Sequence, residues 1–323
     1  MRILIDADIL RYQVGAIKAA HPYIKGEYIP APETEIVKLV DDLIRHVIKI
    51  NKGDSYICAL SGKGNFRNEV AVQQEYKGNR DPNTARPFHY ETVEKHIVKN
   101  YNHIIVDGIE ADDWMAIEQR NDPENTLIAT RDKDMWTCFG WHYRWACGDR
   151  QPEVLKHWVP EFESKLFFFQ QMLTGDNTDN IPGCGIRREV MWGGKLQLRR
   201  KGVGEATAIK LLDGLTTVRE MFDVVSSEYK KVFGENYEEV MLEQARLLYI
   251  GQTADNLFSW DWLDYELSKD TDNGEVLPSD VSECESGNVC EHGESGSGEL
   301  CTGFDSVHYD DERPDIGDDP SIL

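Results

Sequence analysis

Short apolar runs that end at acidic residues constrain the fold of this chain more than any other feature of its sequence. The runs are residues 2–5, 56–60, 103–106 and 126–129. The first ends at Asp6, and the last two are each followed within a few positions by an acidic group that opens a probable helix. Residues 36–50 carry apolar side chains at helical spacing. This alternation predicts an α/β fold with a mostly parallel central sheet flanked by helices.

The acidic residues form four groups that the predicted fold brings together. They are Asp6 and Asp8, then Glu110, Asp112 and Asp113, then Asp132 and Asp134, and finally Asp176 and Asp179. A single group of this kind is more often a helix cap than a site. Four groups together favour a common site, because ligands gather at the carboxyl ends of parallel strands. Carboxylates without nearby His or Cys indicate Mg²⁺ or Mn²⁺.

Two divalent ions roughly 4 Å apart would support in-line hydrolysis of a phosphodiester, and the acids divide accordingly. The predicted closer cluster is Asp6, Glu110, Asp112 and Asp132. Asp134, Asp176 and Asp179 are predicted to complete the second position. The sequence therefore indicates a metal-dependent enzyme that acts on phosphate esters.

The net charge of −23 is concentrated at the end of the chain. Residues 270–323 carry sixteen Asp and Glu residues and one Arg, which leaves −8 on the first 269 residues. Phosphate binding depends on local basic patches rather than on the total charge, so nucleic acid remains a candidate ligand. No apolar run is long enough for a membrane helix, and a soluble cytoplasmic protein is expected.

Two basic segments are candidate phosphate contacts. The first contains Lys63, Arg67, Tyr76, Lys77, Arg80 and Arg86, with Tyr76 as a possible stacking platform and Lys77 as the electrophilic helper beside the scissile phosphate. A solvated basic loop is an equally good interpretation of its charge. The second segment, residues 186–201, has six Lys or Arg residues and one Glu.

The second basic segment leads into a glycine turn, Gly202-Val203-Gly204, which opens a helical region that runs to about residue 251. Such a turn exposes backbone amides to a phosphate, although an ordinary turn between helices has the same pattern. Residues 270–323 are rich in Gly, Ser, Asp and Glu and are expected to be disordered. This tail would solubilise the protein, compete with DNA for the basic patches, or recruit a replication protein.

Six motifs in order resemble those of the flap endonuclease and 5′-nuclease superfamily. They are Ile5-Asp6, Glu-Tyr-Lys-Gly-Asn-Arg-Asp at 75–81, Glu-Ala-Asp-Asp at 110–113, Asp-Lys-Asp at 132–134, Gly-Asp-Asn-Thr-Asp-Asn-Ile-Pro-Gly at 175–183 and Gly-Val-Gly-Glu-Ala-Thr-Ala at 202–208. The resemblance runs from Met1 to roughly residue 250. The residues within the motifs are most similar to those of the bacteriophage branch of 5′ to 3′ exonucleases.

The resemblance implies a PIN-like nuclease domain at 1–181 with a helical arch at about 67–99. It also implies a helix-hairpin-helix DNA-binding module at 182–269, often with bound K⁺. Residue by residue, it makes eight acids the metal ligands: Asp6, Glu110, Asp112, Asp113, Asp132, Asp134, Asp176 and Asp179. Lys77 and Arg80 become cations that face the phosphate, and Lys201, Gly202 and Gly204 belong to the DNA-binding hairpin.

Two departures from the family pattern stand out. The segment from Leu60 to Arg67 lacks the aspartate that family members commonly have after the second strand. A basic insertion of about 15 residues separates Ile181-Pro182-Gly183 from the Gly202 turn. The first departure casts doubt on a complete set of metal-binding acids. The second suggests that DNA follows a different path across this protein.

The implied activity is a 5′ to 3′ exodeoxyribonuclease that uses two Mg²⁺ or Mn²⁺ ions. Flap cleavage and RNase H-like removal of RNA primers in phage DNA replication are expected with it. Its partners would be double-stranded DNA with 5′ ends, flaps or RNA primers. The competing hypotheses are a PIN-domain ribonuclease and a structure-specific DNA-binding protein that has lost catalysis.

Overall fold

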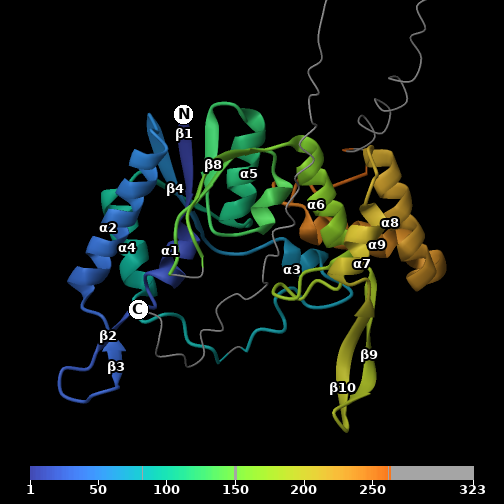
Figure 1. Cartoon of the computed structure of the whole chain (residues 1–323), viewed down its shortest axis with the longest axis horizontal. Helices are drawn as coiled ribbons and strands as arrows, with labels where there is room; N and C mark the ends of the chain where they lie inside the picture. The colour runs from blue at the N-terminus through green and yellow to red at the C-terminus, as the bar shows by residue number, and fades with distance from the viewer. Residues whose placement is uncertain (82, 149–150, 261, 263–323) are drawn as a thin grey trace, which may run out of the picture. The chain divides into compact units, whose positions relative to one another are not determined.

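The central element of the protein is a six-stranded sheet with strand order β5-β4-β1-β6-β7-β8 (Figure 1). The computed structural model describes residues 1–81, 83–148, 151–260 and 262. The strands are β1 (Arg2–Asp6), β4 (Ser55–Ser61), β5 (His103–Val106), β6 (Thr126–Ala129), β7 (Gly140–Arg144) and β8 (Val154–Val159). The first five are parallel to their neighbours, and β8 pairs antiparallel to β7. The predicted α/β class and the four predicted strands are confirmed.

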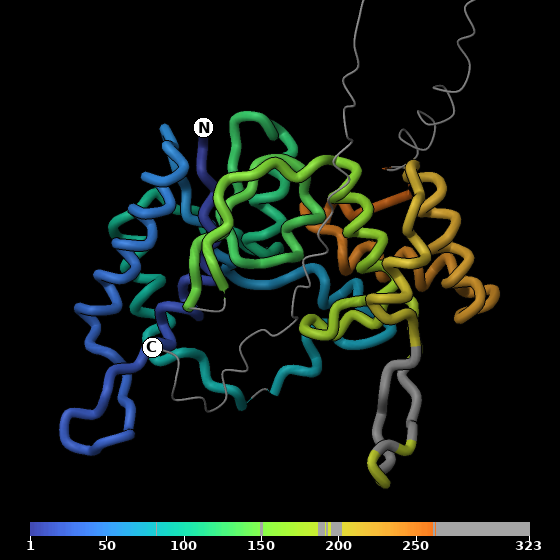
Figure 2. The backbone as a smooth tube through the Cα atoms, in the orientation of Figure 1, coloured from blue at the N-terminus to red at the C-terminus, as the bar shows by residue number. Residues whose placement is uncertain are grey.

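Helices cover both faces of this sheet because the apolar side chains of β1 point alternately to either side. Ile3 and Ile5 pack in one core with α1 (Ala7–Gln13), α2 (Glu33–Ile50) and α4 (Tyr90–Asn100). Leu4 packs on the opposite face with α5 (Ala111–Asn121). Figure 2 shows α2 and α4 side by side on one flank of the sheet. In α2, Ile36, Val40, Ile44 and Val47 are all buried at the expected helical spacing. A small hairpin, β2 (Lys18–Ala20) and β3 (Tyr28–Pro30), precedes α2.

A second core is built mainly from helices. It joins α6 (Glu161–Thr174), α7 (Glu205–Leu212), α8 (Val218–Phe233) and α9 (Tyr237–Leu248), with a short 3₁₀ turn, η2 (Gly234–Asn236), before α9. Phe168, Phe169 and Met172 of α6 are buried in this core. The helical core therefore begins at α6, earlier in the chain than the predicted boundary at residue 182. All described residues belong to one compact unit.

The two cores are joined through Arg67, the first residue of the one-turn helix α3 (Arg67–Val70). Its guanidinium is buried and donates to both oxygens of Asp113 at 2.6 and 2.9 Å, and its Nε donates to Leu247 O at 3.0 Å. Gly251 N also donates to Asp113, at 2.9 Å. Arg67, predicted as a DNA contact, therefore links α5 to α9 in this structure.

The predicted helical arch at about 67–99 takes a different form. In the described residues between α3 and α4, the chain forms turns, and α4 itself packs against α1 and α2 on the sheet. Val72 N and Gln73 N donate to Glu243 of α9 at 2.8 and 2.7 Å, which ties the start of this segment to the helical core. Residues 75–81 lie beyond it and carry the family motif.

The basic insertion forms a β-hairpin, β9 (Gly185–Trp192) and β10 (Lys195–Gly202), which was not predicted. It extends away from helices α6–α9 (Figure 1). The acidic tail at 270–323, and every expectation attached to it, lies outside the described residues. No helix among the described residues is long and apolar enough to cross a membrane.

Candidate active site

The site begins at Asp6, where β1 ends and α1 starts. Its carboxylate caps α1 by accepting from Ile9 N at 3.2 Å, and it accepts from the Thr130 hydroxyl at 2.7 Å. Burial, followed by repulsion from Asp8, raises the pKa of Asp6 to about 7. The neighbouring strand β6 supplies Thr130 just beyond its end, so two adjacent strand ends meet at this carboxylate.

The start of α5 brings the second group to the same edge. Glu110 is the N-cap residue, and Asp112 lies in the first turn, where the positive end of the helix dipole favours acids. Burial, and then the charges of Asp6 and Asp132, raise the pKa of Asp112 well above its ordinary value. Asp112 therefore lies close enough to Asp6 and Asp132 to feel their charges.

The third group follows β6 and continues into a short 3₁₀ helix, η1 (Asp134–Thr137). Asp134 N donates to Asp132 Oδ1 at 2.9 Å, and Gln171 of α6 donates to Asp134 Oδ1 at 2.8 Å. Asp132 N is held by the Thr130 hydroxyl at 2.9 Å. Burial and the charges of Asp132 and Asp176 raise the pKa of Asp134. Thr130 and Gln171 thus orient these acids, and no motif of the sequence pointed to either.

The fourth group lies in the loop after α6, and two glycines shape it. Gly175 and Gly183 have φ of +67° and +58°. A Cβ on Gly175 would lie 2.2 Å from Ile181 O, and one on Gly183 would lie 2.3 Å from Gly175 N. Only glycine fits where the two ends of the loop cross this closely. The loop presents Asp176 and Asp179, and Asp176 Oδ1 accepts from Thr178 N at 2.8 Å.

The 75–80 turn docks directly on this loop. Lys77 N donates to Asp179 O at 2.9 Å, Asn79 donates to Asn177 O at 2.5 Å, and Asn180 donates to Glu75 O at 2.7 Å. Lys77 has φ of +57°, in the left-handed region that residues with a Cβ seldom adopt. The contacts on either side hold this strained residue beside the acids.

The Lys77 ammonium forms an ion pair with Glu110 and lies 3.6 Å from Asp179 Oδ2. Arg80 contacts Asp179 Oδ1 at 2.8 Å. Burial acts to raise the pKa of Glu110, but Lys77 and Arg67 together bring it below its ordinary value. Burial acts to lower the pKa of Lys77, yet Glu110 and Asp179 raise it, so Lys77 is a cation at neutral pH. The predicted cationic pair therefore lies at the acidic cluster.

Two residues with predicted roles in this region are engaged by other side chains of the protein. Tyr76, predicted as a stacking platform, is buried in the helical core, and its hydroxyl donates to Glu110 at 3.0 Å and to Asp179 at 2.8 Å. Asp113, predicted as a metal ligand, is fully buried, with both oxygens engaged by Arg67. Tyr76 orients two acids, and Asp113 stabilises the junction of the two cores.

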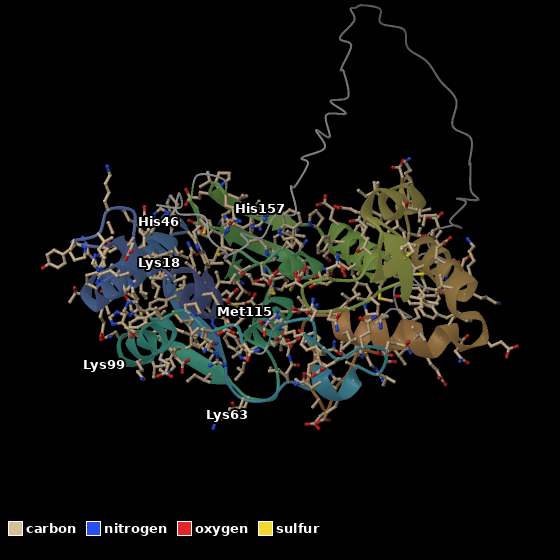
Figure 3. The ribbon with its side chains drawn as sticks, turned by 90° about the horizontal axis from the view of Figure 1, so that it is seen from below. Lys18, His46, Lys63, Lys99, Met115 and His157 are labelled. Atoms are coloured by element: carbon tan, nitrogen blue, oxygen red, sulfur yellow. The ribbon has the colours of Figure 1, made fainter. Side chains whose placement is uncertain are left out.

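The remaining predicted contacts lie farther out. Lys63 is exposed and projects from the loop after β4 (Figure 3). Arg86 lies over the ring of Tyr90, with 4.8 Å between its Cζ and the ring centre. Gly204 is the N-cap residue of α7, and a Cβ there would meet nothing within 4 Å. Gly202 is the last residue of β10, next to Lys201.

The aspartate missing after β4 has a local explanation. Ser61 ends β4, and its hydroxyl accepts from Ala111 N at 2.8 Å, which caps α5. A side chain on Gly62 would lie 2.1 Å from Asp107 Oδ1. Asp8 instead reaches this strand end, because both of its oxygens accept from Ser61 N, at 3.1 and 3.2 Å. Asp8 also pairs with Arg11, so its charge is partly neutralised.

The donor set fits hard divalent cations. Within the described part of the chain, no three acidic, His or Cys side chains already surround one point as ligands. Burial, and then repulsion from neighbouring acids, nevertheless raises the pKa values of Asp6, Asp112 and Asp134, and carboxylate oxygens are what Mg²⁺ and Mn²⁺ prefer. A bound cation would relieve that repulsion, so the residues fit the ions that the motifs imply.

Comparison with solved structures agrees with this arrangement. The chain is similar to a bacteriophage T5 flap endonuclease crystallised with metal ions, at 15% identity over 85% of this chain and 99% of that one, with a TM-score of 0.51. T5 5′-exonuclease with bound zinc aligns at 15% identity over 85% and 100% of the two chains, with a TM-score of 0.49. No protein-family model and no curated sequence matches.

These observations define an α/β protein with a mostly parallel central sheet. The chain shares this fold with the T5 flap endonuclease.

Proposed function

We infer that this chain is a divalent-metal-dependent nuclease that hydrolyses phosphodiester bonds at or near the 5′ ends of DNA. The observation that carries this inference is the meeting of Asp6, Asp112 and Asp132, from separate elements, at one sheet edge next to Glu110, which Lys77 contacts. The fold shared with the T5 enzyme supports it. Exonucleolytic cutting, flap cutting and removal of RNA primers are the activities we expect, in phage-type DNA replication.

Each side chain has a proposed part in the reaction. Asp6, Asp112 and Asp132 would hold one ion, and Asp134, Asp176 and Asp179 the other, with Glu110 beside both. When bound, two Mg²⁺ or Mn²⁺ ions activate a water and stabilise the departing oxygen. Lys77 and Arg80 would exchange their carboxylate contacts for the phosphate of the substrate, where positive charge stabilises the transition state. Tyr76 keeps Glu110 and Asp179 in place through its hydroxyl.

The helical core would hold the duplex. The glycine turn before α7 is the proposed phosphate contact, because a helix begins there and a Cβ on Gly204 would meet nothing within 4 Å. A helix-hairpin-helix made of α6, the turn and α7 is our proposal for this module, with K⁺ as a candidate ion. Duplex DNA with a 5′ end or flap is the proposed partner.

Digestion of a 5′-labelled flap duplex and a blunt duplex in Mg²⁺ tests the function. We expect release of 5′ nucleotides or short flaps that stops in EDTA and in Asp112→Asn. Asp122→Asn is the matched control, because Asp122 is exposed at the opposite end of α5. Product formation by Asp112→Asn at the wild-type rate would contradict the proposed site.

Two other functions compete, each with its own outcome in the same assay. The absence of an acid near Gly62 in the sequence favours a DNA-binding protein without catalysis, which would bind the flap yet leave it intact in both Mg²⁺ and Mn²⁺. A PIN-domain ribonuclease would cut single-stranded RNA and leave the duplex DNA uncut. Cleavage of the DNA substrates excludes the first competitor and disfavours the second.

A further inference from the structure

The β9–β10 hairpin lies where the candidate active site meets the helical core. It starts two residues after Gly183 of the acidic loop and ends two residues before Gly204, the N-cap residue of α7. Its base is closed by the bond from Val203 N to Cys184 O at 3.3 Å. The base of the hairpin is therefore adjacent to the start of α7.

The hairpin has a regular register and a tight end. Its two strands of eight residues pair antiparallel without a bulge, from Gly185 opposite Gly202 to Trp192 opposite Lys195. Gly193 and Gly194 at the tip have φ of +56° and +76°, as a two-residue hairpin turn requires. At about 3.3 Å per residue it extends roughly 25 Å, the length of about seven base pairs.

The register places arginines opposite arginines. Arg187 pairs with Arg200, and Arg188 pairs with Arg199. Directly opposed residues share a face and successive residues alternate, so each face of the ribbon carries one such pair. Like charges in directly opposed positions destabilise an isolated hairpin. Residues 186–201 carry a net charge of +5 in an acidic protein, so a polyanion is the complementary partner.

We propose that the β9–β10 ribbon binds the sugar-phosphate backbone of duplex DNA, as a second contact beyond the α7 turn. A ribbon with basic positions on both faces suits a groove with a phosphate chain on either side, and the major groove admits two strands. The proposal rests on the proposed function for its substrate class and adds the length of duplex that the protein holds.

Two variants remove the contact in different ways. In the first, Arg187, Arg188, Arg199 and Arg200 are all replaced by Gln. In the second, residues 188–199 are replaced by Asn-Gly, which joins the register partners Arg187 and Arg200 by a two-residue turn. The control replaces four exposed lysines of α2 and α4 by Gln: Lys38, Lys49, Lys95 and Lys99. Lys99 lies at the far edge of the sheet domain (Figure 3).

Fluorescence anisotropy in EDTA, over a range of salt, measures duplex binding by the full chain. For a duplex of roughly 20 base pairs we expect both hairpin variants to bind about 10- to 100-fold more weakly. The slope of log K against log salt should fall by about 3 to 4 in the Gln variant, and by less than about 1 in the control. Thermal melting of each variant checks that the fold is kept.

Three outcomes would overturn the proposal. They are unchanged affinity and slope in both hairpin variants, an equal loss in the lysine control, and an equal loss on single-stranded DNA or RNA. Cleavage is scored separately. If the wild type cuts nothing, the proposed function fails while the binding comparison still decides the role of the ribbon. If a hairpin variant at saturating concentration cuts the DNA at a rate within about threefold of the wild-type rate, the ribbon acts in binding alone.

Discussion

The acids of the candidate site form two sets in opposite electrostatic states. Asp6 and Asp112 lie at the sheet edge with raised pKa values, and no cation is among the groups that shift them. Glu110 and Asp179, on the side of the 75–80 turn, are paired with Lys77 and Arg80. Paired carboxylates are stable as they are, whereas crowded like charges cost stability until a cation joins them. This difference supports our proposal that a cation binds at the sheet edge and that the turn contacts the phosphate.

The largest expected effect comes from Asp112→Asn. Cleavage should fall on the order of 1000-fold, because a ligand for the cation is lost. The free energy of unfolding in EDTA should rise by about 1–3 kcal/mol, because repulsion with Asp6 and Asp132 is removed. Kinetics on the flap duplex and urea unfolding measure the two effects. A variant that is both inactive and less stable than the wild type would contradict the claim that crowded acids at the sheet edge cost stability.

Substitution of the adjacent residue, Asp113, should lower the free energy of unfolding instead of raising it. Asp113→Asn leaves the buried Arg67 guanidinium without its carboxylate, and this costs about 3–5 kcal/mol of unfolding free energy. Urea unfolding of the two neighbouring variants, side by side, provides the measurement. Equal stability of Asp113→Asn and wild type would mean that Arg67 does not join the two cores as described.

The sheet edge also predicts how stability depends on pH. The folded-state pKa of Asp6 is raised to about 7 from 3.8, so this carboxyl holds its proton more tightly when folded. Its contribution to stability is present below about pH 4 and is lost as the pH rises through about 7. The loss is on the order of 3 kcal/mol in EDTA between pH 5 and 8.

The difference in unfolding free energy between wild type and Asp6→Asn isolates this term from other titrating groups. Because Asn does not titrate, the unfolding free energy of the variant should increase relative to that of the wild type as the pH rises. Saturating Mg²⁺ should remove this relative increase. A difference that stays constant from pH 5 to 8 would show that Asp6 is ionised throughout.

The smallest effect on cleavage and stability is expected from a change at Tyr76, which contacts the paired carboxylates Glu110 and Asp179. Tyr76→Phe removes a hydroxyl that donates to Glu110 and Asp179, with an expected loss of about 1–2 kcal/mol in unfolding free energy. Cleavage should fall about tenfold, since the two carboxylates lose a common donor. Tyr237→Phe is the matched control, because the Tyr237 hydroxyl contacts Glu238 at 2.9 Å, away from the site. If both variants behaved alike, Tyr76 would have no special role.

The sequence alone was sufficient to predict the strands that have a strong local pattern. Continuous apolar runs identified β1, β4, β5 and β6, because strands of a parallel sheet are buried on both faces. Strands β7 and β8 mix polar and aromatic residues at the sheet edge, and β9 and β10 mix basic with apolar residues, so neither pair has a clear apolar period. Their pairing depends on partners elsewhere in the chain.

The site shows the same division between local and long-range information. The acids at strand and helix ends were identified because motif and topology coincide. Arg67 and Tyr76 were assigned to DNA because composition does not show which side of a loop faces a core. Their partners lie 46 and 103 positions away, at Asp113 and Asp179. Thr130 and Gln171 act only through the acids that they contact, and such residues need coordinates to be found.

The most direct test of the account is calorimetric titration of the protein with Mn²⁺ at pH 6.5, repeated in two buffers of different ionisation enthalpy. Acids with raised pKa values must lose protons when a cation binds, so the wild type should release protons and the apparent heat should differ between the buffers. Asp112→Asn should bind more weakly and release fewer protons, while Asp122→Asn should match the wild type. The absence of binding, or binding without proton release in the wild type, would contradict the assignment of the sheet edge as the metal site.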